Sequence, residues 1–112
     1  MSKVLPVFLC QLRPLRAAML DEGPTPREQE AVEKHFAYLQ DLAGRGVVLV
    51  AGRTLTRGAD AFGICVLRAD SEDTARAIVE ADPAVKAGVM SARLYPFHVA
   101  LLGRATPESW VA

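Results

Sequence analysis

The sequence predicts a single α+β domain in which two amphipathic helices cover one face of an antiparallel sheet. Three observations support this fold class. Apolar runs rich in strand formers alternate with two helix-like segments in the order strand, helix, strand, strand, helix, strand. Each helix-like segment begins at a capping signal. The 112 residues suffice for one core that buries roughly two thirds of the unfolded surface.

The first strand is expected at Val4–Leu12, an apolar run rich in strand formers. Pro6 has no backbone N–H, which indicates an edge strand or a strand end. The pattern is lost over Arg13–Pro24, the longest expected loop. Two interpretations of this loop stay open: a solvated connection, or a partial lid whose arginines meet an anionic ligand.

The first helix is expected to begin at Pro26, because Thr25 can cap it and Glu28 occupies the capping-box position. It should end near Gly44 or Gly46. Its second half carries apolar residues at three- and four-residue spacing, which we expect to face the core. This stripe consists of Val32, His35, Phe36, Leu39, Leu42 and Ala43.

Two further strands should form a hairpin with a long loop. Val47–Ala51 is continuously apolar, which predicts a strand buried on both faces, and Gly52 and Arg53 follow it. Phe62–Leu67 predicts the next strand. The turn between them is expected at Thr56, Gly58, Ala59 and Asp60.

The second helix should run from its N-cap Ser71 to about Ala81. Asp82-Pro83 then breaks the helix, because the residue before a proline is disfavoured in the α region, and a short turn follows. The last strand is expected at Ser91–Leu102, with a bulge or an edge at Pro96.

The expected strands are apolar at odd and even positions alike, whereas a sheet with one face in water alternates. The helix-free face must therefore be covered, and a second copy is the simplest cover. We expect residues 1–103 to form a ferredoxin-like βαββαβ sandwich that pairs sheet to sheet in a homodimer. Residues 104–112 form a C-terminal tail that contains Trp110.

Thirteen basic residues balance thirteen acidic ones, so no charge bias indicates a nucleic acid or an anionic membrane as partner. No apolar run reaches the ~20 residues of a membrane helix, and the N-terminus lacks signal-peptide features. We therefore expect a soluble, cytoplasmic protein. Cys10 and Cys65 lack metal or redox spacing and are interpreted as free buried thiols.

Three stretches resemble the YciI-like domain: EKHFAYLQDLAGRGVVLVAGR, FGICVLRADSEDTARAIVEADPAVKAGV and LYPFHV. The resemblance covers about Val4 to Leu102. It implies a ferredoxin-like dimer of the dimeric α/β-barrel group, with a site that pairs His35 with Asp82. The chain departs from the family in the longer loop that starts at Arg13, and in Arg53, where the family commonly has a proline.

His35 and Asp82 each have two interpretations. The histidine is either a satisfied core residue or lines a cleft, and the aspartate is either a plain cap for the turn at Pro83 or the partner of the imidazole. A carboxylate beside an imidazole fixes its tautomer and favours its charged form, so the pair can exchange a proton near neutral pH. Capping and pairing can coexist, since a carboxylate has two oxygens.

The remaining candidates are expected to contact a small-molecule ligand. They are Arg13, Tyr38, Gly52, Arg53 and Phe97. His98, in the last strand, is interpreted as structural. The sequence contains no metal-ligand cluster, P-loop, dinucleotide-binding glycine motif or nucleophile elbow, so we expect neither a metal nor a cofactor.

Three functions remain open. The first is a cofactor-independent lyase or isomerase that uses His35 and Asp82 on a small metabolite; isomerases and dehydrochlorinases among similar proteins motivate this class by analogy. The second is a non-catalytic dimer that binds a small ligand or acts as an accessory module. The third is a purely structural interaction domain.

Overall fold

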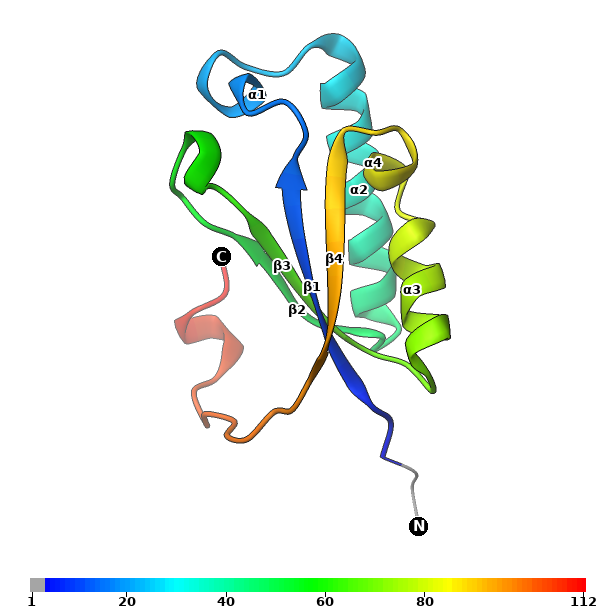
Figure 1. Ribbon diagram of the computed structural model, residues 1–112. Coiled ribbons are helices and arrows are strands. Elements are labelled where there is room, and N and C mark those ends of the chain that lie inside the picture. The colour runs from blue at the N-terminus through cyan, green and yellow to red at the C-terminus, as the bar shows by residue number, and fades with distance from the viewer. Residues whose placement is uncertain (1–3) are drawn as a thin grey trace.

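A four-stranded antiparallel sheet in the order β2-β3-β1-β4 forms one layer of the protein, and helices cover one of its faces (Figure 1). The structure, a computed structural model, describes residues 4–112; residues 1–3 of the expected domain lie outside the described residues. The strands are β1 (Val7–Pro14), β2 (Val48–Arg53), β3 (Gly63–Arg68) and β4 (Met90–Phe97). The α-helices are α1 (Ala18–Asp21), α2 (Pro26–Gly44), α3 (Glu72–Glu80) and α4 (Pro83–Lys86). Short 3-10 turns lie at η1 (Gly58–Asp60) and η2 (Pro107–Ser109). The predicted ferredoxin-like βαββαβ order is confirmed.

The start of α2 follows the predicted capping box. The Thr25 hydroxyl accepts the backbone N–H of Glu28, and the Glu28 carboxylate accepts the backbone N–H of Thr25 at 2.8 Å. Two orphan donors of the first helical turn are thereby satisfied, with Pro26 in the first helical position. The cap therefore fixes where α2 begins.

The core-facing stripe of α2 differs from the predicted one. Of the predicted residues, Val32, Leu39 and Leu42 pack in the core and His35 is partly buried, and Ala31 and Tyr38 join them on this face. Phe36 is 65% exposed, because each residue turns an α-helix by about 100° and so rotates it away from His35. Ala43 is exposed for the same reason, one position after Leu42. Tyr38 takes the core position that the sequence analysis gave to Phe36.

Strand register places one apolar set on each face of the sheet. Cys10 of β1 lies opposite Cys65 of β3 and Leu94 of β4, and all three pack in the core beneath the helices. Leu9, one residue earlier, lies opposite Val66 and Tyr95 on the helix-free face. The helix-free face is therefore apolar along its middle, as the uninterrupted apolar runs predicted.

The prediction of a doubly buried strand at Val47–Ala51 is wrong. The strand is β2, which includes Gly52 and Arg53, lies at the sheet edge, and has only Val48 buried. The register shifts between Val48 and Val50, so these two valines lie on opposite faces of the sheet. Edge position and an uncovered face leave the rest of β2 exposed.

The first strand begins at Val7 rather than Val4 and extends through Pro14, so Arg13 and Pro14 belong to β1 and not to the loop. They pair with the start of β4. The connection to α2 then contains one turn of helix, α1, whose Met19 is buried. The expected long loop is thus shorter and partly structured.

The last strand ends at Phe97 and not at Leu102. Phe97 lies opposite Val7, the first residue of β1, so His98 would next face Pro6. Proline has no N–H to donate to a ladder, and pairing stops there. The apolar residues after Phe97 consequently have no strand partner among residues 4–112.

Candidate active site

His35 and Asp82 meet between α2 and α4, although 47 residues separate them in the sequence. Nδ1 of His35 lies 2.5 Å from Oδ2 of Asp82, and their side chains are 13% and 4% exposed. Oδ1 of the same carboxylate accepts the backbone N–H of Ala84 at 2.9 Å, so Asp82 also caps α4. Both interpretations of Asp82 from the sequence are therefore realised at once.

This arrangement determines which nitrogen of His35 is available. An ionised carboxylate only accepts hydrogen bonds, so Nδ1 must carry the proton that it donates to Asp82. Nε2 has no partner among the described residues, and none of their side-chain nitrogens or oxygens is both buried and unpartnered. Nε2 of the neutral imidazole therefore presents a lone pair to solvent.

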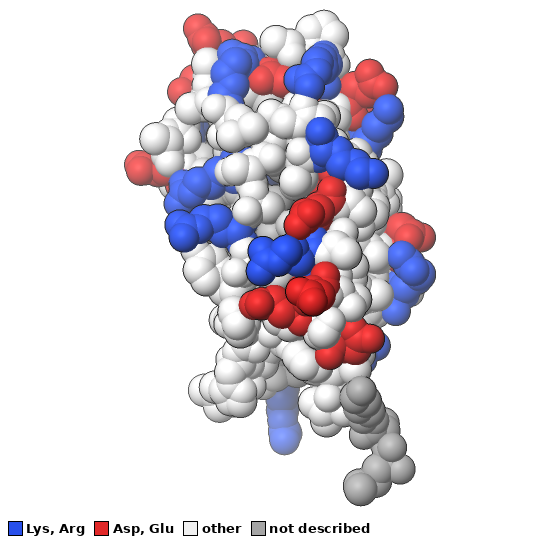
Figure 2. All heavy atoms as spheres, turned by 45° about the vertical axis from the view of Figure 1, so that its right-hand side comes forward, with Lys and Arg blue, Asp and Glu red and all other residues white. Residues whose placement is uncertain are grey.

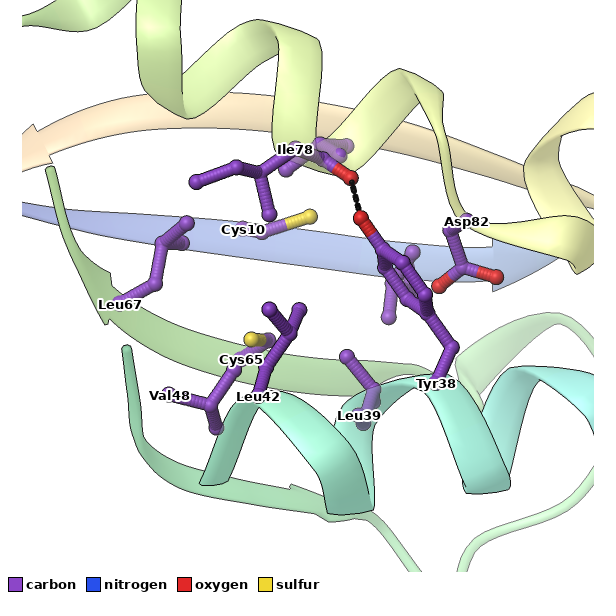
Figure 3. Close-up of a pocket in the computed structure, with 11 residues that line it drawn as sticks. Cys10, Tyr38, Leu39, Leu42, Val48, Cys65, Leu67, Ile78 and Asp82 are labelled. Carbon is purple, nitrogen blue, oxygen red and sulfur yellow. Dashed lines mark hydrogen bonds between the residues drawn. The ribbon is translucent and has the colours of Figure 1, made fainter. Parts of the chain in front are cut away.

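A second hydrogen bond joins α2 to the segment that carries Asp82. The Tyr38 hydroxyl donates to the backbone carbonyl of Ile78 at 2.7 Å, linking α2 to α3 (Figure 3). Tyr38 lies three residues after His35, and Ile78 four residues before Asp82, so both bonds join the same two segments. Since its hydroxyl proton is used here, Tyr38 stabilises the spacing between the helices that carry the pair.

Beneath this contact lies an internal cavity of about 10 Å³, close to the space that one water molecule needs. Asp82 lies at one end of it, and Cys10 and Cys65 point into the space between helices and sheet (Figure 3). Burial, aided by the charge of Asp82, raises the pKa of Cys10 to about 11. Burial, aided by Cys10, raises the pKa of Cys65 to about 12. Both thiols stay protonated at neutral pH, which fits the structural role predicted for them.

The segment before α2 is tied to the helix by an ion pair that the sequence analysis missed. The Arg16 guanidinium donates to both carboxylate oxygens of Glu28, at 2.9 and 2.6 Å. This hydrogen bond, together with the backbone N–H of Thr25, lowers the pKa of Glu28 to about 2. Met19 of α1 then packs with Ala84, the residue after Pro83, and closes this end of the helix layer.

Arg13 and Gly52, two of the other predicted ligand contacts, lie on the helix-free face, away from His35. Arg13 lies over the ring of Phe62, 5.3 Å from its centroid, and donates to the carbonyl of Ala59. A shallow groove of about 260 Å³ follows the adjoining ends of β2 and β3. It is lined by Val50, Gly52, Arg53, Thr54, Phe62 and Ile64.

Phe97 lies at the far end of β4, opposite Val7 and partly exposed. The structure thus brings together His35, Asp82 and Tyr38 on the helix side, and Arg13 and Gly52 on the other side. Arg53 lines the edge of the groove, but it lies opposite Gly63, on the face of the sheet that Cys65 and Leu67 share. Phe97 also lies on the helix-free face, but at the opposite end of the sheet from the groove, and His98 is exposed beyond the end of β4.

The sequence pattern of the YCII-related domain matches residues 6–98. The chain belongs to the YCII-related domain family. A comparison with curated proteins finds no match. Among solved structures, the chain is similar to 5-chloro-2-hydroxyhydroquinone dehydrochlorinase from Burkholderia phenoliruptrix in complex with 2,5-dihydroxybenzoquinone. The two chains are 24% identical with a TM-score of 0.62, over 82% of this chain and 93% of the other.

The family match confirms the resemblance on which His35 and Asp82 were selected, and the likeness to the dehydrochlorinase shows a shared fold. The match ends at residue 98, one residue after β4. Residues 99–112 of this YCII-related protein therefore lie outside the region that the family pattern describes.

The surface around the helices has no extended patch of positive or of negative charge. Figure 2 shows acidic and basic side chains interspersed on this face. Ion pairs between helix residues four positions apart join Glu30 to Lys34 and Asp41 to Arg45. Within residues 4–112, no three His, Cys, Asp or Glu side chains gather as a metal site. Over the same residues, no helix has the length and apolar character to span a membrane.

Proposed function

We propose that this YCII-related protein is a cofactor-independent enzyme of the lyase or isomerase type, in which His35 and Asp82 act as an acid/base pair on a small metabolite. The observation that carries the proposal is the 2.5 Å contact between Nδ1 of His35 and Oδ2 of Asp82. It leaves Nε2 as the proton acceptor and gives the imidazolium formed after proton transfer a buried counter-charge.

The same pair serves either reaction class. In an elimination, Nε2 takes a proton from the substrate, the electron pair passes into the ring, and the leaving group departs as an anion. In an isomerisation, the imidazolium returns the proton to a different substrate atom. The similar dehydrochlorinase, solved with a dihydroxybenzoquinone, supports a hydroxylated or quinonoid ring as the first substrate class to examine.

The proposal includes a homodimer formed through the helix-free face. Leu9 and Val66 lie in the middle of that face, and Val50, Tyr95 and Phe97 on its edge strands are among the exposed large side chains. Apolar patches of this kind on soluble proteins usually mark an interface. Pairing two copies across a two-fold axis would cover the same patch on each.

A second candidate function is non-catalytic binding of a small anionic ligand in the groove beside β2. Arg53 and the nearby Arg13 supply positive charge, while Val50, Phe62 and Ile64 supply an apolar floor. Its volume of about 260 Å³ lies just under the roughly 300–1,000 Å³ of typical ligand pockets. Gly52 lets a ligand approach the strand closely; Tyr38 and Phe97 remain proposed contacts outside the groove.

The two candidates are separated by one screen. Thermal shift identifies metabolites that bind, starting with hydroxylated and chlorinated aromatic rings, and NMR of each mixture detects a product. The acid/base proposal predicts turnover that falls about 10²–10⁴-fold in His35→Gln and is unchanged in His98→Gln. Binding without product, abolished by Arg53→Gln, would instead support the groove. Turnover that survives His35→Gln would refute the acid/base role.

A further inference from the structure

The last segment of the chain, His98–Ala112, is here called the C-terminal arm. It leaves the end of β4 on the side of the sheet opposite α2 and α3 (Figure 1). Strand pairing stops at Phe97, and the backbone N–H groups of residues 98–104 have no partner among residues 4–112. The arm is therefore joined to the body only through β4.

The arm exposes large apolar side chains. Leu101 is 92% and Leu102 is 88% exposed, and Trp110 and Val111 are also mostly exposed. The arm contains only two charged residues, Arg104 and Glu108. Such a composition is typical of the inner part of a permanent interface, where charged residues are depleted.

The arm does not pack against its own domain. The radius of gyration is 14.7 Å, whereas a compact chain of this length has about 13 Å. Docking on its own sheet would already have buried Leu101 and Leu102. They are instead the two most exposed leucines among residues 4–112. The apolar residues of the arm must be covered by something other than this chain.

We propose that the C-terminal arm of each protomer packs on a second copy of the chain, so that the dimer is held by exchanged arms as well as by its sheets. This inference rests on the dimer included in the proposed function. It goes beyond the family pattern, because that pattern ends at residue 98.

A second copy suits the arm better than a different protein because one symmetric contact covers both apolar surfaces. Each chain offers one uncovered sheet face and one uncovered arm, and a two-fold axis brings each arm to the partner. With thirteen basic and thirteen acidic residues, the chain has no net charge that would select an oppositely charged partner.

The area of the sheet also argues for a contribution from the arm. Strands of six to eight residues, at about 3.3 Å per residue and about 4.8 Å between strands, give a face of roughly 440 Å² in projection. A stable interface buries about 800 Å² of accessible surface on each partner, a quantity that is larger than the flat projection of the face that provides it. The exposed apolar side chains of the arm add to the accessible surface that the sheet face offers.

Trp110, the only tryptophan of the chain, lies in the arm and reports directly on its packing. The experiment measures mass by sedimentation velocity and Trp110 emission with acrylamide quenching, both over a series of protein concentrations. We expect a shift from 12.1 kDa to twice that mass, with a blue shift and reduced quenching of Trp110 over the same range.

The full-length double variant Leu101→Asp/Leu102→Asp should raise the dissociation constant at least about 100-fold, as the loss of buried leucines predicts. Phe36→Asp, on the solvent side of α2, is the matched control and should leave it unchanged. Circular dichroism checks that each variant is folded.

Every outcome decides the inference. A dimer in which Trp110 stays open to quenching would refute arm exchange while leaving the proposed sheet dimer intact. A protein that is monomeric at all concentrations would refute both. Burial of Trp110 at concentrations where the protein sediments at 12.1 kDa would mean that the arm docks on its own chain.

Discussion

The carboxylate of Asp82 binds His35 with one oxygen and the backbone N–H of Ala84 with the other, at 2.5 and 2.9 Å. The residue that starts α4 is thus also the residue that orients the imidazole. Because the cap fixes the carboxylate, the carboxylate can fix the tautomer of His35 without help from a further side chain.

Replacing Asp82 should separate its two roles. Asp82→Asn keeps an oxygen for the Ala84 N–H, so the free energy of unfolding should change by less than about 1 kcal/mol. Asp82→Ala removes the cap and leaves buried polar groups unpaired, which should cost about 1–3 kcal/mol. Urea unfolding measures both. Equal losses in the two variants would contradict the capping role.

Tyr38→Phe should destabilise the protein by about 0.5–1.5 kcal/mol, because the carbonyl of Ile78 loses its donor. The melting temperature should then fall by a few degrees, roughly 2–8 °C. Tyr95→Phe on the helix-free face is the matched control. If both substitutions lower the melting temperature equally, the hydrogen bond between Tyr38 and Ile78 does not contribute the stability predicted for it.

Acid should loosen the start of α2. The pKa of Glu28 is lowered to about 2, below its usual value, so its stabilising contribution is complete above about pH 4.5 and is lost as the pH falls toward 2. Unfolding curves between pH 6 and 2 should show less loss of stability in Glu28→Gln, which lacks this titration, than in the wild type. If the wild type and Glu28→Gln lose stability identically as the pH falls, the Arg16–Glu28 pair is not the cause of the acid destabilisation.

High pH should lower the stability of the fold by ionising the two buried thiols. The pKa values of Cys10 and Cys65 are raised to about 11 and 12, so their contribution is complete below about pH 9 and is lost as the pH rises further. A thiol reagent at pH 8 should label neither cysteine in the folded protein and both in guanidinium. Rapid labelling of the folded protein would mean that the core around them opens.

The sequence predicted most of the fold because its signals are local. The capping box at Thr25, the cap at Ser71 and the break at Asp82-Pro83 each lie within a few residues, and each is present in the structure. His35 and Asp82 were paired by resemblance to the YciI-like domain. No spacing rule connects residues that lie 47 positions apart.

The remaining features depend on distant contacts. Arg16 binds Glu28 from the bend just before α1, a short helix that the sequence pattern of this segment did not indicate. The end of β4 at Phe97 depends on which residue of β1 lies opposite, and the edge position of β2 depends on strand order. An apolar run indicates burial without saying whether the same chain or a second copy supplies the cover.

The central claim, that Asp82 makes Nε2 of His35 the available base, is tested most directly by ¹⁵N NMR of the imidazole in the wild type and in Asp82→Asn, with His98→Gln used to assign the signals. In the wild type at a pH where His35 is neutral, we predict a proton on Nδ1 and none on Nε2. In Asp82→Asn, the asparagine carbonyl takes the Ala84 N–H and its amide N–H faces Nδ1, so the proton should move to Nε2. The same tautomer in both proteins would contradict the claim.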